Sequence, residues 1–151
     1  MKKKLSNKSF FEKTVVLQKI KKIKQSKGDI HKFVDISSPM FKKFGEIYFT
    51  EIKKKSIKGW KKHKKNFSLI KIIIEKIKFI FFSNNALYTI TLKDSDNMII
   101  QIPPKIWFSF EGMGKKNLLS NMIDNKHSDN EVDTISIRSF NKIFKDNEIK
   151  K

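Results

Sequence analysis

The segment FGEIYFTEIKKKSIKGWKKHKK, residues 44–65, has the clearest structural and chemical pattern in the chain. Its first half, Glu46 to Ile52, is rich in β-branched and aromatic residues between polar ones, which is typical of a half-buried strand. Its second half, Lys58 to Lys65, places a glycine before a tryptophan, lysines and a histidine, so we expect a turn at Gly59. Such a turn would present polar groups at the mouth of a small barrel, where ligands commonly bind.

Short apolar runs repeat along the rest of the chain and predict an all-β fold. Asn, Asp, Ser, Gly and Pro separate them at intervals of about 8–12 residues, the spacing of a sandwich or barrel. Between residues 13 and 27 a basic amphipathic helix and a pair of strands both fit, and the β-branched residues favour strands. We predict a small antiparallel barrel with strands at 46–52, 67–74, 76–82, 86–92, 98–102, 106–110, 118–123 and 134–137.

The length of 151 residues fits one domain with one core. Phe140, Ile143 and Phe144 recur at helical spacing near the end, which predicts a short helix that docks on the barrel. We therefore divide the chain into a polar N-terminal segment, residues 1–12, a barrel, residues 13–137, and a C-terminal helical tail, residues 138–151.

The formal charge of +19 suggests an anionic partner. However, Arg138 is the only arginine among 34 basic residues, and proteins that recognise phosphates and bases in nucleic acids favour arginine for its bidentate geometry. Nucleic acid is therefore an unlikely partner, whereas a lysine-rich pocket suits a substrate with a diphosphate. The absence of cysteine excludes disulfides, thiolate nucleophiles and cysteine zinc sites.

The spacing of the histidines and the length of the apolar runs argue against two further kinds of protein, metal-binding proteins and proteins inserted into a membrane. His31, His63 and His127 lie far apart with no metal-binding spacing between them, so we predict no metal site. The apolar runs are too short for a signal peptide or a transmembrane helix. We expect a cytoplasmic protein without membrane insertion.

Four segments form a longer pattern: FGEIYFTEI, KGWKKHKK, PPKIWFSFEGMG and SNMIDNKHSDNE. In order and spacing they resemble the sugar-nucleotide epimerase branch of the cupin barrels, related to dTDP-4-dehydrorhamnose 3,5-epimerase. The likeness covers residues 28–135, and all five glycines of the chain fall on glycine positions of that family.

The resemblance implies a cupin barrel, usually dimeric, that uses neither a metal nor an organic cofactor. Its reaction would be the removal and return of a proton next to the ketone of a 4-keto nucleoside-diphosphate sugar, as a step in surface-polysaccharide synthesis. This chemistry needs a base, a group that stabilises the enolate, an acid and cations for the diphosphate.

The resemblance also assigns roles within residues 58–65. It places Lys58 at the diphosphate-binding arginine and Lys61 at the basic histidine, while His63 lies two residues on and so on the same face of an extended segment. Lys61 is a candidate base if burial lowers its pKa, and His63 is a candidate proton shuttle because histidine titrates near neutral pH. The alternative is that both are solvated residues of a turn.

Three further residues are candidate substrate contacts. Trp60 and Trp107 can stack on a sugar or nucleobase, although aromatic residues at strand ends also serve as core. Asn121 matches the family, and its alternative role is to satisfy backbone groups at the barrel end. The resemblance places neither Tyr48 nor Tyr88 at the position of the acid tyrosine.

Two rival hypotheses remain. The family's Asp-x-Arg motif is missing after Phe82, where the loop is shorter, which favours a catalytically impaired cupin that binds a nucleotide sugar or a partner enzyme. The third hypothesis is a basic barrel that binds nucleic acid.

Overall fold

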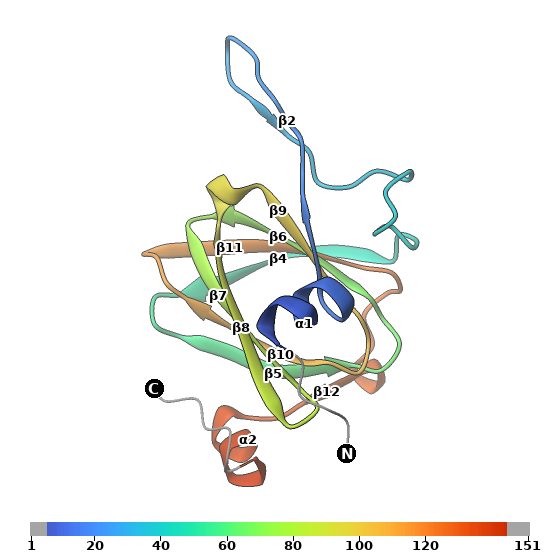
Figure 1. Ribbon diagram of the computed structural model, residues 1–151, viewed down its shortest axis with the longest axis vertical. Coiled ribbons are helices and arrows are strands. Elements are labelled where there is room, and N and C mark those ends of the chain that lie inside the picture. The colour runs from blue at the N-terminus through green and yellow to red at the C-terminus, as the bar shows by residue number, and fades with distance from the viewer. Residues whose placement is uncertain (1–5, 145–151) are drawn as a thin grey trace.

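The computed structural model describes residues 6–144, which form two facing antiparallel sheets with a short helix at each end (Figure 1). In spatial order, the first sheet contains β1 (Val16–Lys19), β9 (Met98–Ile102), β6 (Ser68–Ile74), β11 (Lys116–Ile123) and β4 (Glu46–Lys53). The second contains β12 (Val132–Thr134), β5 (Ile57–His63), β10 (Trp107–Gly112), β7 (Lys76–Ser83) and β8 (Ala86–Lys93). The predicted all-β, antiparallel architecture is confirmed.

The remaining elements are short. The helices are α1 (Asn7–Lys13) and α2 (Ile137–Ile143), the 3-10 turns are η1 (Asp94–Asp96) and η2 (Asp129–Glu131), and a small separate hairpin pairs β2 (Lys22–Ile23) with β3 (Ile30–His31). Strands rather than a helix therefore form between residues 13 and 27, as the β-branched residues predicted. Within residues 6–144, no helix is long and apolar enough to cross a membrane.

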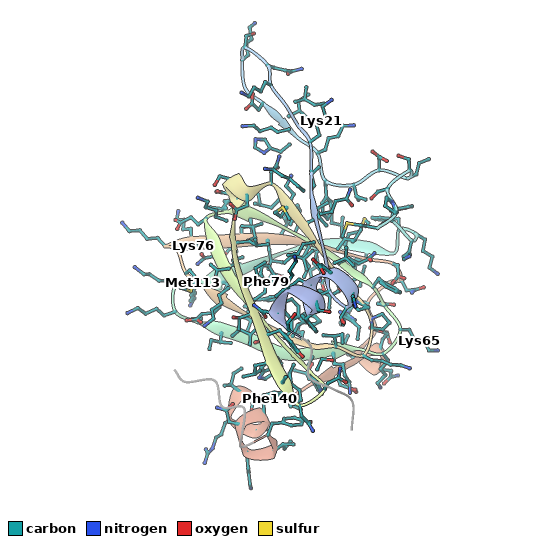
Figure 2. All side chains as sticks on the ribbon, in the orientation of Figure 1. Lys21, Lys65, Lys76, Phe79, Met113 and Phe140 are labelled. Atoms are coloured by element: carbon teal, nitrogen blue, oxygen red, sulfur yellow. The ribbon has the colours of Figure 1, made fainter. Side chains whose placement is uncertain are left out.

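Alternating side chains of both sheets meet in one core. Phe79 of β7 is fully buried, and its ring meets that of Phe110 of β10 edge-on at 5.5 Å; Figure 2 labels Phe79. From the opposite sheet the same cluster receives Ile70, Ile72, Ile100 and Ile102. Aromatic and β-branched side chains therefore form the buried core of the barrel between β6, β7 and β9.

The N-terminal segment contributes to this core. Ser6 caps α1 by accepting a hydrogen bond from the N–H of Ser9, at 3.2 Å. Phe10 is buried, and its ring stacks on that of Tyr88 with 3.9 Å between the centroids. Residues 7–13 are thus a packed helix rather than a loose polar end, while residues 1–5 lie outside the described residues.

The C-terminal helix begins earlier than expected. The Ser136 hydroxyl accepts a hydrogen bond from the N–H of Ser139, at 3.0 Å, and this cap starts α2 at Ile137. The predicted strand 134–137 is therefore wrong beyond Thr134, and the predicted helix extends over Ile137–Ile143, with residues 145–151 outside the described part. Phe140 anchors the helix against β5 and β7, as predicted for a docking helix.

Candidate functional site

A cavity of about 310 Å³ lies between the sheets, with β4 and β11 on one wall and β5 and β10 on the other. Of the residues predicted from the sequence, it brings together Lys58, Lys61, His63 and Asn121. The cavity also exposes Tyr48, which the sequence analysis did not select. Polar groups therefore converge in this part of the barrel, whereas the neighbouring part is packed with apolar side chains.

A bulge in β5 puts three of these side chains on one face. Lys58 and Lys61 pair with β10 residues that are only two apart, so β5 has one extra residue at this point. Without the extra residue, simple alternation would group Lys58 with Trp60 instead. The bulge turns Trp60 away from the cavity and brings Lys61 and His63 into it beside Lys58.

Gly59 permits the bulge. Its φ is +119°, and a Cβ at this position would lie 2.8 Å from Cβ of Ser109 and 2.9 Å from the carbonyl oxygen of Phe108. Only glycine accommodates both the positive φ and the close approach of β10. The predicted turn at Gly59 is therefore wrong. Gly59 lies inside β5, and the bulge changes the face to which the following side chains of the strand point.

His63 forms a buried pair with Glu131. The histidine is 4% exposed, and its Nδ1 lies 2.6 Å from Oε2 of Glu131. The other carboxylate oxygen accepts hydrogen bonds from the backbone N–H groups of Lys65 and Asn66, at 2.8 and 2.9 Å. Glu131 thus fixes the imidazole, and with Nδ1–H donated to the carboxylate the lone pair lies on Nε2.

The Glu131 carboxylate is stabilised in its ionised form. Burial alone raises its pKa, but the hydrogen bonds from His63 and from the N–H groups of Lys65 and Asn66 outweigh burial and lower the pKa below its usual value. The pair therefore has the arrangement of a base and its orienting carboxylate.

Tyr48 stands on the opposite wall. It is the register partner of Asn121 on β11, and the Asn121 side-chain amide donates a hydrogen bond to the Tyr48 hydroxyl, at 2.8 Å. The pKa of Tyr48 is raised above its usual value, chiefly by burial. The hydrogen bond from Asn121 opposes this increase, and the charges of Glu46 and Glu131 add to it. The phenol therefore keeps its proton at neutral pH and can donate it.

The lysines in and just after β5 point to two different sides of the second sheet. Lys62 and Lys64 form ion pairs with Asp133, at 3.0 and 3.6 Å. Lys58 and Lys61 line the cavity, and neither has an ion pair among the described residues. Two uncompensated cations therefore face the cavity, as a phosphorylated ligand requires.

The structure does not bring the two tryptophans into the cavity. Trp60 is fully buried behind β5, where its ring stacks on Phe140 at 4.1 Å. Trp107 packs in the same cluster and lies under Nζ of Lys62, 4.6 Å from the ring centroid. Both belong to the layer between the second sheet and α2, away from the residues that line the cavity.

The sequence contains a signal for Tyr48 but none for the pairing of Glu131 with His63. Tyr48 shares its strand face with the buried Ile52, so the alternation of residues 46–52 already directs it inward. Glu131 ends the last of the four family-like segments, but its partner His63 lies 68 residues earlier and no local pattern joins them. Within residues 6–144, no three His, Cys, Asp or Glu side chains gather as metal ligands do.

No protein-family model and no curated protein matches the sequence. Solved structures do match: a dTDP sugar isomerase from Desulfovibrio desulfuricans G20 is 26% identical, with a TM-score of 0.77 over 82% of this chain and 85% of that one. The chain is a divergent structural relative of the cupin dTDP-sugar isomerases. The resemblance recognised in the four sequence segments is thereby confirmed at the level of the fold.

Two further cupin structures share the fold at lower identity. One is a variant of the 3,4-ketoisomerase QdtA from Thermoanaerobacterium thermosaccharolyticum in complex with TDP-4-keto-6-deoxyglucose, 17% identical, TM-score 0.68, over 89% of this chain and 94% of that one. The other is the 3,5-epimerase RmlC from Legionella pneumophila Philadelphia 1 in complex with dTDP-4-keto-L-rhamnose, 10% identical, TM-score 0.72, over 80% and 72%.

Proposed function

We propose that the protein isomerises or epimerises a 4-keto nucleoside-diphosphate sugar. The observation that supports this most is the buried His63–Glu131 pair beside the cavity, at 2.6 Å. The inward-facing Lys58 and Lys61 add positive charge where a diphosphate would lie. Related folds hold dTDP sugars of this type, which agrees with the chemistry of these side chains.

The proposed reaction begins at the carbon next to the ketone. Nε2 of His63 removes the proton, the C–H electron pair moves into the carbonyl, and an enolate forms. Lys61 stabilises the enolate oxygen by its charge, and Lys58 holds the diphosphate. Return of a proton to the same carbon from the Tyr48 side inverts that carbon. Return of the proton to the former carbonyl carbon moves the ketone instead, provided that the hydroxyl on the deprotonated carbon passes its proton to the enolate oxygen and becomes the new carbonyl.

The wider proposal includes a homodimer and a sugar destined for a surface polysaccharide, which rest on the sequence resemblance. The residues named above supply the base, the acid and the positive charge, so no step of this proposal uses a metal or an organic cofactor.

A second candidate is a cupin that binds a nucleotide sugar without turnover. The turn between β7 and β8 contains only Asn84 and Asn85, both with positive φ, at 51° and 55°. This tight hairpin leaves no loop to carry the Asp-x-Arg motif of the family. The diphosphate would then rely on lysines alone, which are less specific for phosphate than arginine.

Proton exchange separates the two candidates. The purified protein is incubated in deuterated water with TDP-4-keto-6-deoxyglucose or dTDP-4-keto-L-rhamnose, and the ring protons beside the ketone are followed by NMR. We expect one ring signal to disappear faster than without protein, and the position lost identifies the carbon. Saturable binding without any exchange would reject the isomerase and support the binding protein.

A further inference from the structure

One end of the barrel carries a cluster of lysines. It is formed by the turns that join β4 to β5, β6 to β7, β8 to η1 and β10 to β11. Seven exposed lysines lie in or beside these turns and together form the lysine end: Lys53, Lys54, Lys55, Lys76, Lys93, Lys115 and Lys116. Within residues 6–144, none of the seven forms an ion pair.

The strand register brings these lysines together. Lys53 is the register partner of Lys116, and Lys76 is the register partner of Lys93. The turn between β10 and β11 joins the two pairs, because the N–H of Met113 donates a hydrogen bond to the carbonyl of Lys76, at 2.9 Å. Like charges directly opposite each other destabilise a sheet, so both pairs oppose folding unless an anionic partner neutralises them.

The carboxylates of the same turns do not balance this charge. Both oxygens of Glu75 accept hydrogen bonds from backbone N–H groups, those of Lys115 and Lys116, at 2.8 and 3.3 Å. Asp94 accepts one from the N–H of Glu75, at 3.0 Å, and Asp96 accepts one from a backbone N–H of β8, at 2.9 Å. These three carboxylates shape the turns, and seven lysines leave a surplus of positive charge around them.

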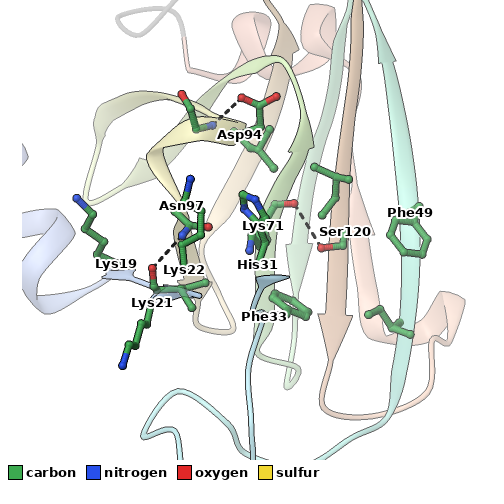
Figure 3. Close-up of a pocket in the computed structure, with 15 residues that line it drawn as sticks. Lys19, Lys21, Lys22, His31, Phe33, Phe49, Lys71, Asp94, Asn97 and Ser120 are labelled. Carbon is green, nitrogen blue, oxygen red and sulfur yellow. Dashed lines mark hydrogen bonds between the residues drawn. The ribbon is translucent and has the colours of Figure 1, made fainter. Parts of the chain in front are cut away.

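In two other basic regions the chain itself supplies partners for lysines. A groove of about 1080 Å³ lies between the hairpin of β2 and β3 and the outer face of the first sheet (Figure 3). There Lys22 pairs with Asp29, at 2.9 Å, and Lys71 donates a hydrogen bond to a backbone carbonyl. Beside β5, Asp133 pairs with two lysines, at 3.0 and 3.6 Å. At the lysine end, by contrast, the charge is available to an external partner.

Apolar side chains accompany the lysines. Met113, in the turn between β10 and β11, is 39% exposed, and Ile74, at the end of β6, is 41% exposed. Figure 2 labels Met113 and Lys76 at this end of the molecule and Lys65 at the other. The phosphates of a nucleic acid offer nothing to exposed apolar groups. An anionic lipid surface accommodates both kinds of side chain, because ammonium groups meet its headgroups and apolar groups enter its acyl boundary.

We propose that the lysine end docks the protein on an anionic phospholipid surface, with the lysines at the headgroups and Met113 at the acyl boundary. Lysine suits this partner, because its ammonium group is a point charge that needs no fixed geometry in a fluid headgroup layer. The inference goes beyond the proposed function and does not rest on it, since none of the seven lysines lines the cavity of about 310 Å³.

Sedimentation with vesicles tests the docking. The full chain, without any sugar, is mixed at physiological salt with vesicles of phosphatidylcholine alone or of phosphatidylcholine with phosphatidylserine, and we expect binding to the anionic vesicles only. The triple variant Lys54→Gln/Lys115→Gln/Lys116→Gln should bind about 100-fold more weakly, because each lysine near an anionic surface contributes about fivefold.

A second triple variant is the matched control. Lys65→Gln/Lys105→Gln/Lys126→Gln removes the same charge from exposed lysines at the opposite end of the barrel. It should weaken binding by less than about fivefold, because salt screens charges that lie far from the surface. The unfolding temperatures of both variants verify that they fold. Equal weakening in the two would show a general effect of net charge and overturn the inference.

A fluorescent label identifies the contact site. The chain has no cysteine, so Met113→Cys carries one environment-sensitive dye at the lysine end, and Lys65→Cys carries it at the other. We expect anionic vesicles to shift the emission of the first to the blue and to leave the second unchanged. A shift of the second alone would overturn the inference. So would a wild type that binds a single-stranded RNA but no vesicles, which would make nucleic acid the partner.

Discussion

Two parts of the same barrel interior differ in what they contain. Between β6, β7 and β9 the inward positions hold side chains such as Ile70, Phe79 and Ile100, all fully or almost fully buried. Between β4, β5 and β11 the inward positions hold Tyr48, His63 and other polar groups around a cavity of about 310 Å³. The first part makes the barrel stable, and the rigid wall it provides lets the second part remain open.

The two parts meet at β10. Phe108 and Phe110 belong to the apolar cluster and also line the cavity, and the ring of Phe108 stacks against that of His63 at 5.9 Å. The apolar part therefore shields the histidine from water on one side. The comparison predicts that changes in the polar part alter activity or binding, whereas changes in the apolar part alter stability.

The largest expected effect is on turnover. We predict that His63→Ala lowers the rate of exchange or turnover by about 10²–10⁴-fold, the usual contribution of an acid–base group. Its matched control is Lys62→Ala, because Lys62 is on the same strand but faces Asp133 outside the cavity. Unaltered kinetics of the His63→Ala variant in the NMR assay would contradict the role of His63 as the base.

The next effect is on stability. Phe79 is fully buried in the apolar part, and Phe79→Ala should lower the free energy of unfolding by about 3–5 kcal/mol because it leaves a cavity. Lys61→Ala in the polar part should change it by less than about 0.5 kcal/mol, since the lysine is exposed. Urea denaturation of both variants measures the change in the free energy of unfolding. Similar losses in the two variants would contradict the distinction between a stabilising apolar part and a functional polar part.

Tyr48→Phe removes only the hydroxyl from the wall opposite His63. We expect roughly a 10²-fold loss of turnover, at the low end for an acid–base group, with little change in sugar binding. The kinetic constants and a binding titration check this. A variant with normal turnover would show that the returning proton comes from another group.

Lys58→Ala removes one inward-facing cation. We expect nucleotide-sugar binding to weaken by about tenfold, because a hydrogen bond to a charged group typically contributes about 1.5 kcal/mol. Calorimetric titration measures the effect, and Lys64→Ala, which removes an outward lysine paired with Asp133, should bind normally. Equal weakening in both would indicate a general effect of charge.

The smallest effect concerns pH. The folded protein lowers the pKa of Glu131, so this carboxylate stabilises the fold at pH values above its unfolded pKa, and the contribution is lost as the pH falls through the lower folded pKa. Glu131→Gln should therefore melt below the wild type at neutral pH, and the difference should shrink under acidic conditions. A difference that grows on acidification would contradict the lowered pKa.

Local patterns predicted most of the strands. The β-branched and aromatic residues of Glu46–Ile52 and the apolar runs that follow reflect burial on one or both faces, which the sequence displays directly. The same patterns failed at Gly59, because a bulge depends on the register with β10 and not on residues next to it. They also failed at residues 134–137, where the cap at Ser136 ends the strand and starts α2.

Local patterns also predicted only part of the candidate site. Lys58, Lys61 and His63 are near one another in the chain, so their convergence in the cavity follows once the bulge is present. Trp60 was a candidate ligand contact because its ring can stack on a sugar or nucleobase, but α2 covers its side of the sheet and buries it against Phe140. Packing by a distant element decided its place.

By itself, the sequence determined an all-β chain with an antiparallel two-sheet fold and a basic segment able to face a phosphorylated ligand. It did so because strand alternation and side-chain charge are local properties. Only the tertiary structure decided that His63 pairs with Glu131 across 68 residues, that Tyr48 stands on the opposite wall, and that Phe49 is left exposed on the outer face of β4. These are contacts between segments far apart in the chain, and they depend on the register of the strands and on which faces are covered.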